Sequence, residues 1–155
     1  MVIAFDRDTS HYNLLRKDHE YDALGRLIRE TRGAGITFFE ADKKADIPLI
    51  HQTQTLDRWG NCLAETNVRG YTTRYTYNAL NQVTEQILPE VNVTDEHGVT
   101  RLLNPTLHMA YDALGRAIAI TDANGHTRTK ILDAEGRILD DIDALGYHHQ
   151  KTYNL

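Results

Sequence analysis

The sequence lacks the features that mark several large classes of protein. Of its 155 residues only Cys62 is a cysteine, which excludes an internal disulfide and a cysteine-based zinc cluster. No apolar run approaches the roughly 20 residues that a membrane-spanning helix needs. The formal net charge is −5 and Lys and Arg form no run, so we expect no nucleic-acid surface, because phosphate contacts need a basic patch. Cys62 itself is expected to be a small buried apolar residue.

The sequence also lacks a recognisable catalytic or metal-binding motif. It contains neither a Gly-x-Ser-x-Gly elbow nor a P-loop, and its eight histidines are scattered without the spacing that a zinc site favours. Asp140, Asp141 and Asp143 are interpreted as a solvated acidic rim rather than a metal site. His148 and His149 are adjacent, so a strand would point them to opposite faces. We therefore predict no catalytic, metal or cofactor residues, and no enzyme activity.

What the sequence does contain is a repeat. Residues 111–116, Tyr-Asp-Ala-Leu-Gly-Arg, repeat residues 21–26 letter for letter. Weaker copies occupy residues 56–61, 77–82 and 132–137, and a further copy begins at Tyr153. Three of the intervals between copies are 21 residues, and the other two, 35 and 34 residues, exceed that period by 14 and 13. The chain is therefore predicted to have one period of 21 residues with two insertions.

Each copy of the motif has the chemistry of a tight turn. An Asp or Asn side chain accepts hydrogen bonds from backbone N–H groups just ahead, and a Gly three positions later takes a positive φ without a Cβ clash. We predict turns at residues 22–25, 57–60, 78–81, 112–115 and 133–136. A second glycine follows the motif glycine by 10 residues at Gly35, Gly70, Gly125 and Gly146. The third unit lacks this pair and has Asn81 and Val91 instead.

The segments between the turns favour strands. Residues 72–77 and 116–121 are rich in β-branched or aromatic residues at alternating positions. Helix is the rival interpretation, because Ala, Leu and Arg are good helix formers. However, a glycine every 10 or 11 residues would cost a helix about 1 kcal/mol each time. The predicted fold class is all-β, with antiparallel strand-turn-strand repeats of 21 residues.

The predicted domain organisation has two parts. Residues 1–20 form a degenerate leading segment, in which residues 5–8 faintly echo the motif. Charged residues follow Met1 too closely for these first residues to be a signal peptide. Residues 21–155 form the repeat region, with insertions near 36–50 and 88–106. The first is expected to extend a strand to a charged tip at residues 42–44. The second is expected to form a short hairpin through Val91, Val93 and Val99, with its tip at His97 and Gly98. Either insertion could make contacts or be a tolerated surface loop.

Together, the Tyr-Asp-x-x-Gly-Arg motif, the 21-residue period and the second glycine resemble the YD repeats of Rhs proteins. Similar repeats occur in the C component of Tc toxin complexes and in teneurins. The resemblance covers about residues 21–155. The departures are Asn81 in place of the motif Gly, Asn61 and Gln82 in place of Arg, and Leu56 and Leu132 in place of Tyr. They weaken individual turns and leave the pattern intact.

The resemblance implies a structural role, as an arc of a hollow YD-repeat β-shell that encloses a C-terminal toxin domain. The tyrosines would pack between strands, the glycines would form turns, and the arginines would brace neighbouring strands through carboxylates such as those of the motif. The implied structural residues are Tyr21, Asp22, Gly25, Arg26, Gly60, Gly70, Tyr77, Tyr111, Asp112, Gly115, Arg116, Gly125, Asp133, Gly136, Arg137, Gly146 and Tyr153.

The resemblance also implies partners and a location. The partners would be the remainder of a YD-repeat shell or another copy of the chain, together with a toxin domain. The location would be the bacterial cytoplasm before export, followed by secretion or delivery as part of a larger polymorphic toxin used in interbacterial competition. Two other classes of function stay open. Exposed tyrosines and Trp59 on a sheet could stack on sugars, and a hydrolytic or toxic enzyme is the least favoured class.

Overall fold

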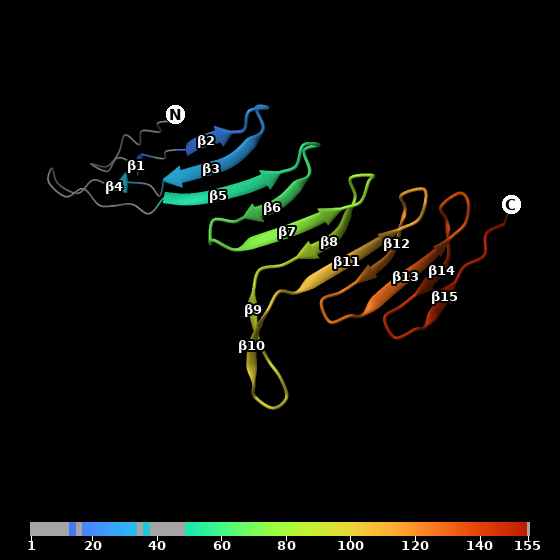
Figure 1. The fold of residues 1–155 in the computed structure, drawn as a ribbon. Coiled ribbons are helices and arrows are strands. Elements are labelled where there is room, and N and C mark those ends of the chain that lie inside the picture. The colour runs from blue at the N-terminus through green and yellow to red at the C-terminus, as the bar shows by residue number, and fades with distance from the viewer. Residues whose placement is uncertain (1–12, 15–16, 34–35, 38–48, 155) are drawn as a thin grey trace. The chain divides into compact units, whose positions relative to one another are not determined.

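The computed structural model describes residues 13–14, 17–33, 36–37 and 49–154 of the chain (Figure 1). Every regular element in these residues is a β-strand, and each strand pairing is antiparallel, which confirms the predicted fold class. No helix capable of crossing a membrane is found there. Three expectations fall outside the described residues: the motif echo at 5–8, the turn glycine Gly35 and the charged tip at 42–44.

The chain divides into two compact units, of which residues 1–72 form the first. Its main strands pair with their neighbours in the order β2-β3-β5-β6, and β1 pairs separately with β4. The strands are β1 (Asn13–Leu14), β2 (Lys17–Tyr21), β3 (Leu27–Gly33), β4 (Ile36–Thr37), β5 (Leu49–Leu56) and β6 (Cys62–Thr66).

Residues 73–155 form the second unit. Its main strands follow the order β7-β8-β11-β12-β13-β14-β15, and β9 pairs with β10 in a separate two-stranded sheet. The strands are β7 (Thr72–Tyr77), β8 (Val83–Ile87), β9 (Val91–Thr94), β10 (Thr100–Leu103), β11 (Thr106–Tyr111), β12 (Ala117–Thr121), β13 (Thr127–Leu132), β14 (Ile138–Ile142) and β15 (His148–Gln150).

The motif forms the hairpin turns at one end of the strands. In the turn between β11 and β12, the Gly115 N–H donates to the Asp112 carbonyl at 2.9 Å, and the Asp112 N–H donates to the Arg116 carbonyl at 3.0 Å. Gly115 has φ 77°, so this is a type I turn closed by a left-handed residue. The register shifts by one residue beside Tyr111, which is the accompanying β-bulge. The same hydrogen bonds occur in all five predicted turns, which are thereby confirmed.

A second series of turns closes the opposite ends of the strands with the same pair of hydrogen bonds. It occupies residues 67–70, 122–125 and 143–146. The third unit also has this turn, at residues 95–98, with Gly98 at φ 79°. The tip expected at His97 and Gly98 is therefore confirmed, and so is the short hairpin of the second insertion, formed by β9 and β10. The insertion lengthens both strands of its hairpin, which moves the glycine from the expected position of Val91 to position 98.

The described residues contain no buried apolar side chain. Only Thr31 and Asp140 are buried among them, and large apolar side chains such as Leu114, Leu145 and Ile120 are more than half exposed. The strands are therefore held by their backbone ladders and by polar contacts at the turns, rather than by a hydrophobic core within the described part of the chain.

Candidate functional site

Many of the side-chain hydrogen bonds in the described residues lie in the motif turns. Within each turn, the motif Asp or Asn accepts hydrogen bonds from groups of that same turn. Asp112 Oδ1 accepts from the Leu114 N–H at 3.0 Å and from the Arg116 N–H at 2.8 Å. Its other oxygen, Oδ2, accepts from Arg116 Nε at 2.6 Å. The Asp22–Arg26 turn repeats all three contacts. The motif Asp therefore satisfies backbone donors that the tight turn leaves unpaired, and it also orients the arginine.

The same arginine then connects one turn to the next within its unit. In the second unit, Arg116 Nη1 donates to the carbonyl of Asp133 in the following motif turn at 2.8 Å. In the first unit, Arg26 Nη1 donates to the carbonyl of Asp57 at 2.7 Å. The arginines were expected to brace neighbouring strands through carboxylates, but Arg26 and Arg116 each make two different contacts. The carboxylate belongs to the same turn, and the contact that crosses to the next turn is with a backbone carbonyl.

Gln82 performs the same connection where the motif arginine is missing. Its Nε2 donates to the Gly115 carbonyl at 2.6 Å, and its Oε1 accepts from Asn78 Nδ2 at 3.1 Å. A glutamine amide is long enough to reach and carries the required N–H donor. In the sequence, Gln82 stands out only as a departure from the motif arginine. The signal that it functions as a link was its position, directly after the turn residue Asn81.

Two motif tyrosines make a second set of contacts between successive repeats. The Tyr111 hydroxyl donates to the Val83 carbonyl at 2.7 Å, and the Tyr153 hydroxyl donates to the Ile138 carbonyl at 3.0 Å. Val83 and Ile138 occupy the same place in their repeats, six residues after the first motif position. The guanidinium of Arg137 also lies over the ring of Tyr153, 4.9 Å from the ring centroid. The hydroxyl, as well as the ring, therefore connects successive repeats.

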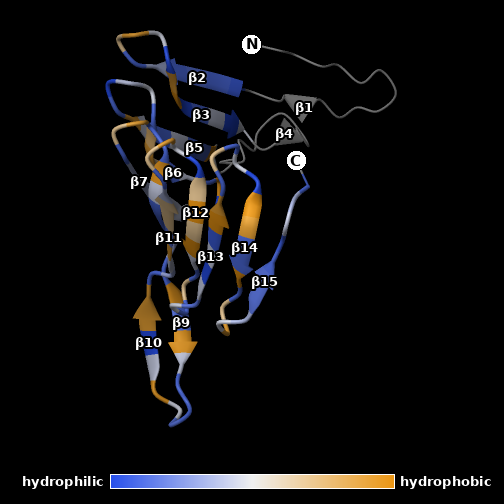
Figure 2. Ribbon diagram, turned by 90° about the vertical axis from the view of Figure 1, so that its right-hand side faces the viewer, coloured by the Kyte–Doolittle hydropathy of each residue, from blue (hydrophilic) through white to orange (hydrophobic). Residues whose placement is uncertain are grey.

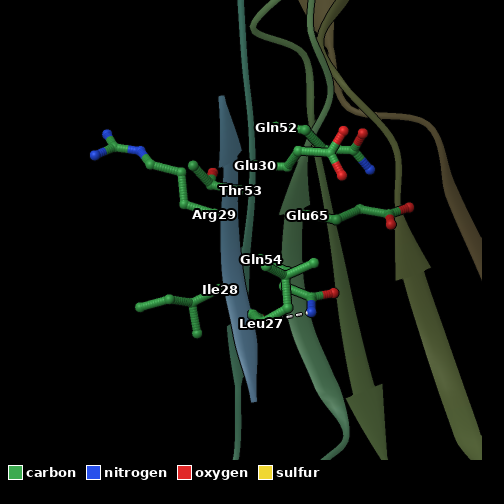
Figure 3. Close-up of a pocket in the computed structure, with 8 residues that line it drawn as sticks. All are labelled: Leu27, Ile28, Arg29, Glu30, Gln52, Thr53, Gln54 and Glu65. Carbon is green, nitrogen blue, oxygen red and sulfur yellow. Dashed lines mark hydrogen bonds between the residues drawn. The ribbon is translucent and has the colours of Figure 1, made fainter. Parts of the chain in front are cut away.

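Gln54 supplies the equivalent donor where Leu56 replaces the motif tyrosine. Figure 3 shows its amide bonded to the Leu27 carbonyl, and both residues line a depression across β3, β5 and β6. The same depression holds Glu30, which is ion-paired with Arg32 and with Lys17. The Arg32 guanidinium, followed by the Lys17 ammonium, lowers the pKa of Glu30. Glu30 is thus held ionised in a structural ion pair and is poorly suited to act as a general acid.

Leu132 offers a direct test of the tyrosine contact. A Leu132→Tyr substitution should place a hydroxyl near the Ala117 carbonyl, because Ala117 lies six residues after the first motif position of the preceding repeat. We expect a gain of about 0.5–1.5 kcal/mol in the free energy of unfolding over Leu132→Phe, which has the ring without the hydroxyl. Tyr111→Phe should lose a similar amount. Equal stability of the tyrosine and phenylalanine variants in urea titrations would show that the hydroxyl contact contributes nothing.

The motif carboxylates also predict a pH dependence. The backbone N–H of Arg26 and that of Arg116, followed by their side chains, lower the pKa of Asp22 and of Asp112. A carboxyl whose pKa is lower in the folded state contributes stability above its unfolded pKa, about 3.9, and loses it as the pH falls through the folded value. We expect the urea midpoint to be constant between pH 5 and 7 and to fall below about pH 4. A midpoint that rises on acidification would contradict these assignments.

Two expectations from the sequence are wrong: the solvent exposure of Asp140 and the burial of Cys62. Asp140 is not part of a solvated rim: it is 6% exposed, and its Oδ2 lies 2.7 Å from Nδ1 of His148. The register that aligns His148 with Ile142 brings the imidazole over Asp140. Asp141 pairs with Arg128 at 2.6 Å. Cys62 is partly exposed rather than buried, and its surroundings still raise the pKa of its thiol by desolvation.

The predicted structural glycines take the conformation that their turns require. Gly25, Gly60, Gly70, Gly115, Gly125, Gly136 and Gly146 all have positive φ. Asn81, in place of a motif glycine, has φ 58° and is the one non-glycine residue with positive φ in the described part of the chain. The motif residues are thus brought together as turn and inter-turn contacts.

No cluster of three or more side chains suited to metal binding occurs among the described residues.

Comparison with known proteins gives one family. The RHS Repeat family matches residues 57–90 and 111–148, which are the stretches containing four of the motif turns. No curated protein sequence matches the chain.

Solved structures of TcdB2-TccC3 have a fold similar to that of this chain. The crystal structure of TcdB2-TccC3 without the hypervariable C-terminal region aligns with 84% of this chain at 16% identity and a TM-score of 0.55. TcdB2-TccC3 aligns with 78% at 16% identity and a TM-score of 0.53. TcdB2-TccC3-Cdc42 aligns with 89% at 14% identity and a TM-score of 0.51. The alignments span 6–7% of the length of those solved chains. The 21-residue period, the repeated hairpin turns and the family matches identify the chain as an Rhs/YD-repeat protein.

Proposed function

We propose that the chain is a wall segment of a Tc- or Rhs-type β-shell that encloses or docks a C-terminal toxin domain. In this role the motif residues are structural. Asp112 forms its turn, Arg116 and Gln82 fix the spacing between successive turns, and Tyr111 ties adjacent repeats together. The segment itself carries out no reaction, and it is delivered from a bacterial cell as part of a larger toxin.

The observation that carries this proposal is the absence of a buried apolar side chain in the described residues. A self-contained domain buries most of its large apolar side chains, because that burial is the main driving force of folding. These strands instead keep Ile120, Ile131 and Leu139 more than one-third exposed. A sheet of this kind suits a wall, since the remainder of a shell and its contents would cover such residues.

The proposal is tested by binding. The chain is immobilised and its affinity is measured for the toxin domain encoded downstream of it. We expect saturable binding that weakens when Ile120 and Leu139, which lie on the same face of the sheet, are changed to Ser. The matched control changes two exposed turn residues, Leu114 and Leu145, which lie at the strand ends. Absence of binding, or equal loss in the control, would contradict the proposal.

A carbohydrate-binding module is the second candidate, favoured by exposed aromatic side chains. Trp59, Tyr71 and Tyr147 are 64%, 52% and 65% exposed and could stack on sugar rings. The Arg58 guanidinium, however, lies 3.9 Å from the centre of the Trp59 ring and covers one of its faces. A glycan array separates the candidates. The wall segment should bind no glycan, whereas specific binding that is lost in Trp59→Ala would favour the module.

A further inference from the structure

The β9–β10 hairpin is a projecting arm whose strands pair only with each other in the described structure. We call residues 89–105 the arm. It extends beyond the ends of β8 and β11 (Figure 1), and every residue of β9 and of β10 is exposed. Its base is closed where the Leu88 N–H donates to the Pro105 carbonyl at 2.8 Å. Its tip is the regular second turn of the third repeat, so the arm is a lengthened hairpin with a defined register.

The register shows which backbone groups of the arm face outward. At the tip, the Asp95 N–H donates to the Val99 carbonyl, and the Thr94 and Thr100 hydroxyls lie 2.8 Å apart as a pair without ladder hydrogen bonds. Hydrogen-bonded and non-hydrogen-bonded pairs alternate in an antiparallel ladder. Val93 and Val91 therefore bond to β10, while the N–H and C=O groups of Asn92 and Thr94 point away from it. These outward groups form a free strand edge.

The side chains around that edge combine apolar and acidic character. Val91 and Val93 lie on one face together with Leu103, and all three are at least 43% exposed. Figure 2 shows hydrophobic stretches in the ribbons of both β9 and β10. Carboxylates flank β9 at both ends, with Glu90 before it and Asp95 and Glu96 after it. Asp95 Oδ1 is used by the turn, whereas the Glu96 side chain is 88% exposed. A strand added here would meet an apolar face between two negatively charged ends.

We propose that the free edge of β9 docks an extended peptide segment of a partner protein, with apolar residues at alternate positions and basic residues at its ends. Such a segment would add as a third strand, so that its backbone bonds to Asn92 and Thr94 and its apolar side chains cover Val91 and Val93. Its basic ends would meet Glu90 and Glu96. A second copy of the arm fits less well, because the arm carries three carboxylates against the single guanidinium of Arg101.

The test uses the whole chain and a short fluorescent peptide of alternating valine and threonine with lysine at both ends. Binding is followed by fluorescence polarisation. We expect saturable binding that weakens at least about tenfold in Asn92→Pro, which removes an outward N–H and places a ring on the β9 edge. Leu102→Pro is the matched control on the opposite edge, at the position paired with Asn92, and should bind the peptide normally. Circular dichroism checks that both variants keep their strands.

A peptide with glutamate in place of lysine should bind at least about tenfold more weakly, because the ends of β9 repel it. Three results would overturn the proposal: no binding of the lysine peptide, equal binding of the two peptides, or equal binding by Asn92→Pro and the unchanged chain. Light scattering of the chain alone adds a fourth. Self-association that Asn92→Pro abolishes would assign the edge to a second copy of the chain.

Discussion

Asp112→Ala should lower the melting temperature by about 5 °C or more, the largest effect that we expect of a single motif residue. The change removes the acceptor for two backbone N–H groups and for Arg116 Nε. It also releases the guanidinium that donates to the Asp133 carbonyl, so the link to the next turn is weakened together with the turn itself. Leaving partly buried donors without an acceptor is costly, and charged partners raise the cost.

Asp122→Ala is the matched control for this prediction. Asp122 accepts the same two backbone N–H groups, from Asn124 and His126, but its turn has no arginine that reaches another turn. Its substitution should therefore lower the melting temperature clearly less than Asp112→Ala does. Thermal unfolding followed by circular dichroism measures both. Equal effects of the two changes would mean that Asp112 acts only as a turn cap.

Gly115→Ala should cost about 1 kcal/mol or more in the free energy of unfolding. Its φ of 77° is strained for any residue with a Cβ. In addition, an added Cβ would lie 3.3 Å from Nε2 and 3.4 Å from Oε1 of Gln82, whose amide donates to the Gly115 carbonyl. The substitution therefore strains the turn and crowds the inter-turn hydrogen bond. Urea unfolding at constant pH gives the loss.

Two further substitutions separate these causes. Gly25 has φ 76°, and an added Cβ there would meet nothing within 4 Å, so Gly25→Ala should show the backbone strain alone and a smaller loss. Asn81→Gly relieves a non-glycine left-handed residue at the equivalent turn position and should be neutral or slightly stabilising. If all three changes left the unfolding free energy unaltered, the left-handed closure of these turns would be wrong.

The turns and strands could be predicted because their causes are local. The Asp side chain at 112 and the flexibility of Gly115 act within four residues, and the 21-residue spacing shows where the next turn begins. The tip of the second insertion, at His97 and Gly98, was predicted from the sequence. Its equivalence to the second turn of the other repeats was not apparent, because the lengthened hairpin places Gly98 outside the 10-residue spacing. Its flanking residues, Thr94-Asp95 and Thr100, nevertheless match Thr121-Asp122 and Thr127.

The contacts between repeats were less predictable, because they depend on which strands lie side by side. The place of Gln82 after the turn residue Asn81 marks it as the counterpart of the motif arginine, but it does not show that the amide reaches the Gly115 carbonyl, 33 residues further along the chain. The burial of Asp140 follows from the pairing of β14 with β15, which brings His148 over it. In the sequence alone, the acidic neighbours of Asp140 suggest a solvent-exposed surface. Once the register is known, the same residue is the buried partner of a histidine.

The central claim is that these repeats build the wall of a larger assembly rather than a self-sufficient domain. The most direct measurement is light scattering of the purified chain over a concentration series, with urea unfolding followed at each concentration. Because no described apolar side chain is buried, we expect the chain to associate and its unfolding midpoint to rise with concentration. A strictly monomeric species that unfolds cooperatively, with the same midpoint at every concentration, would contradict the claim.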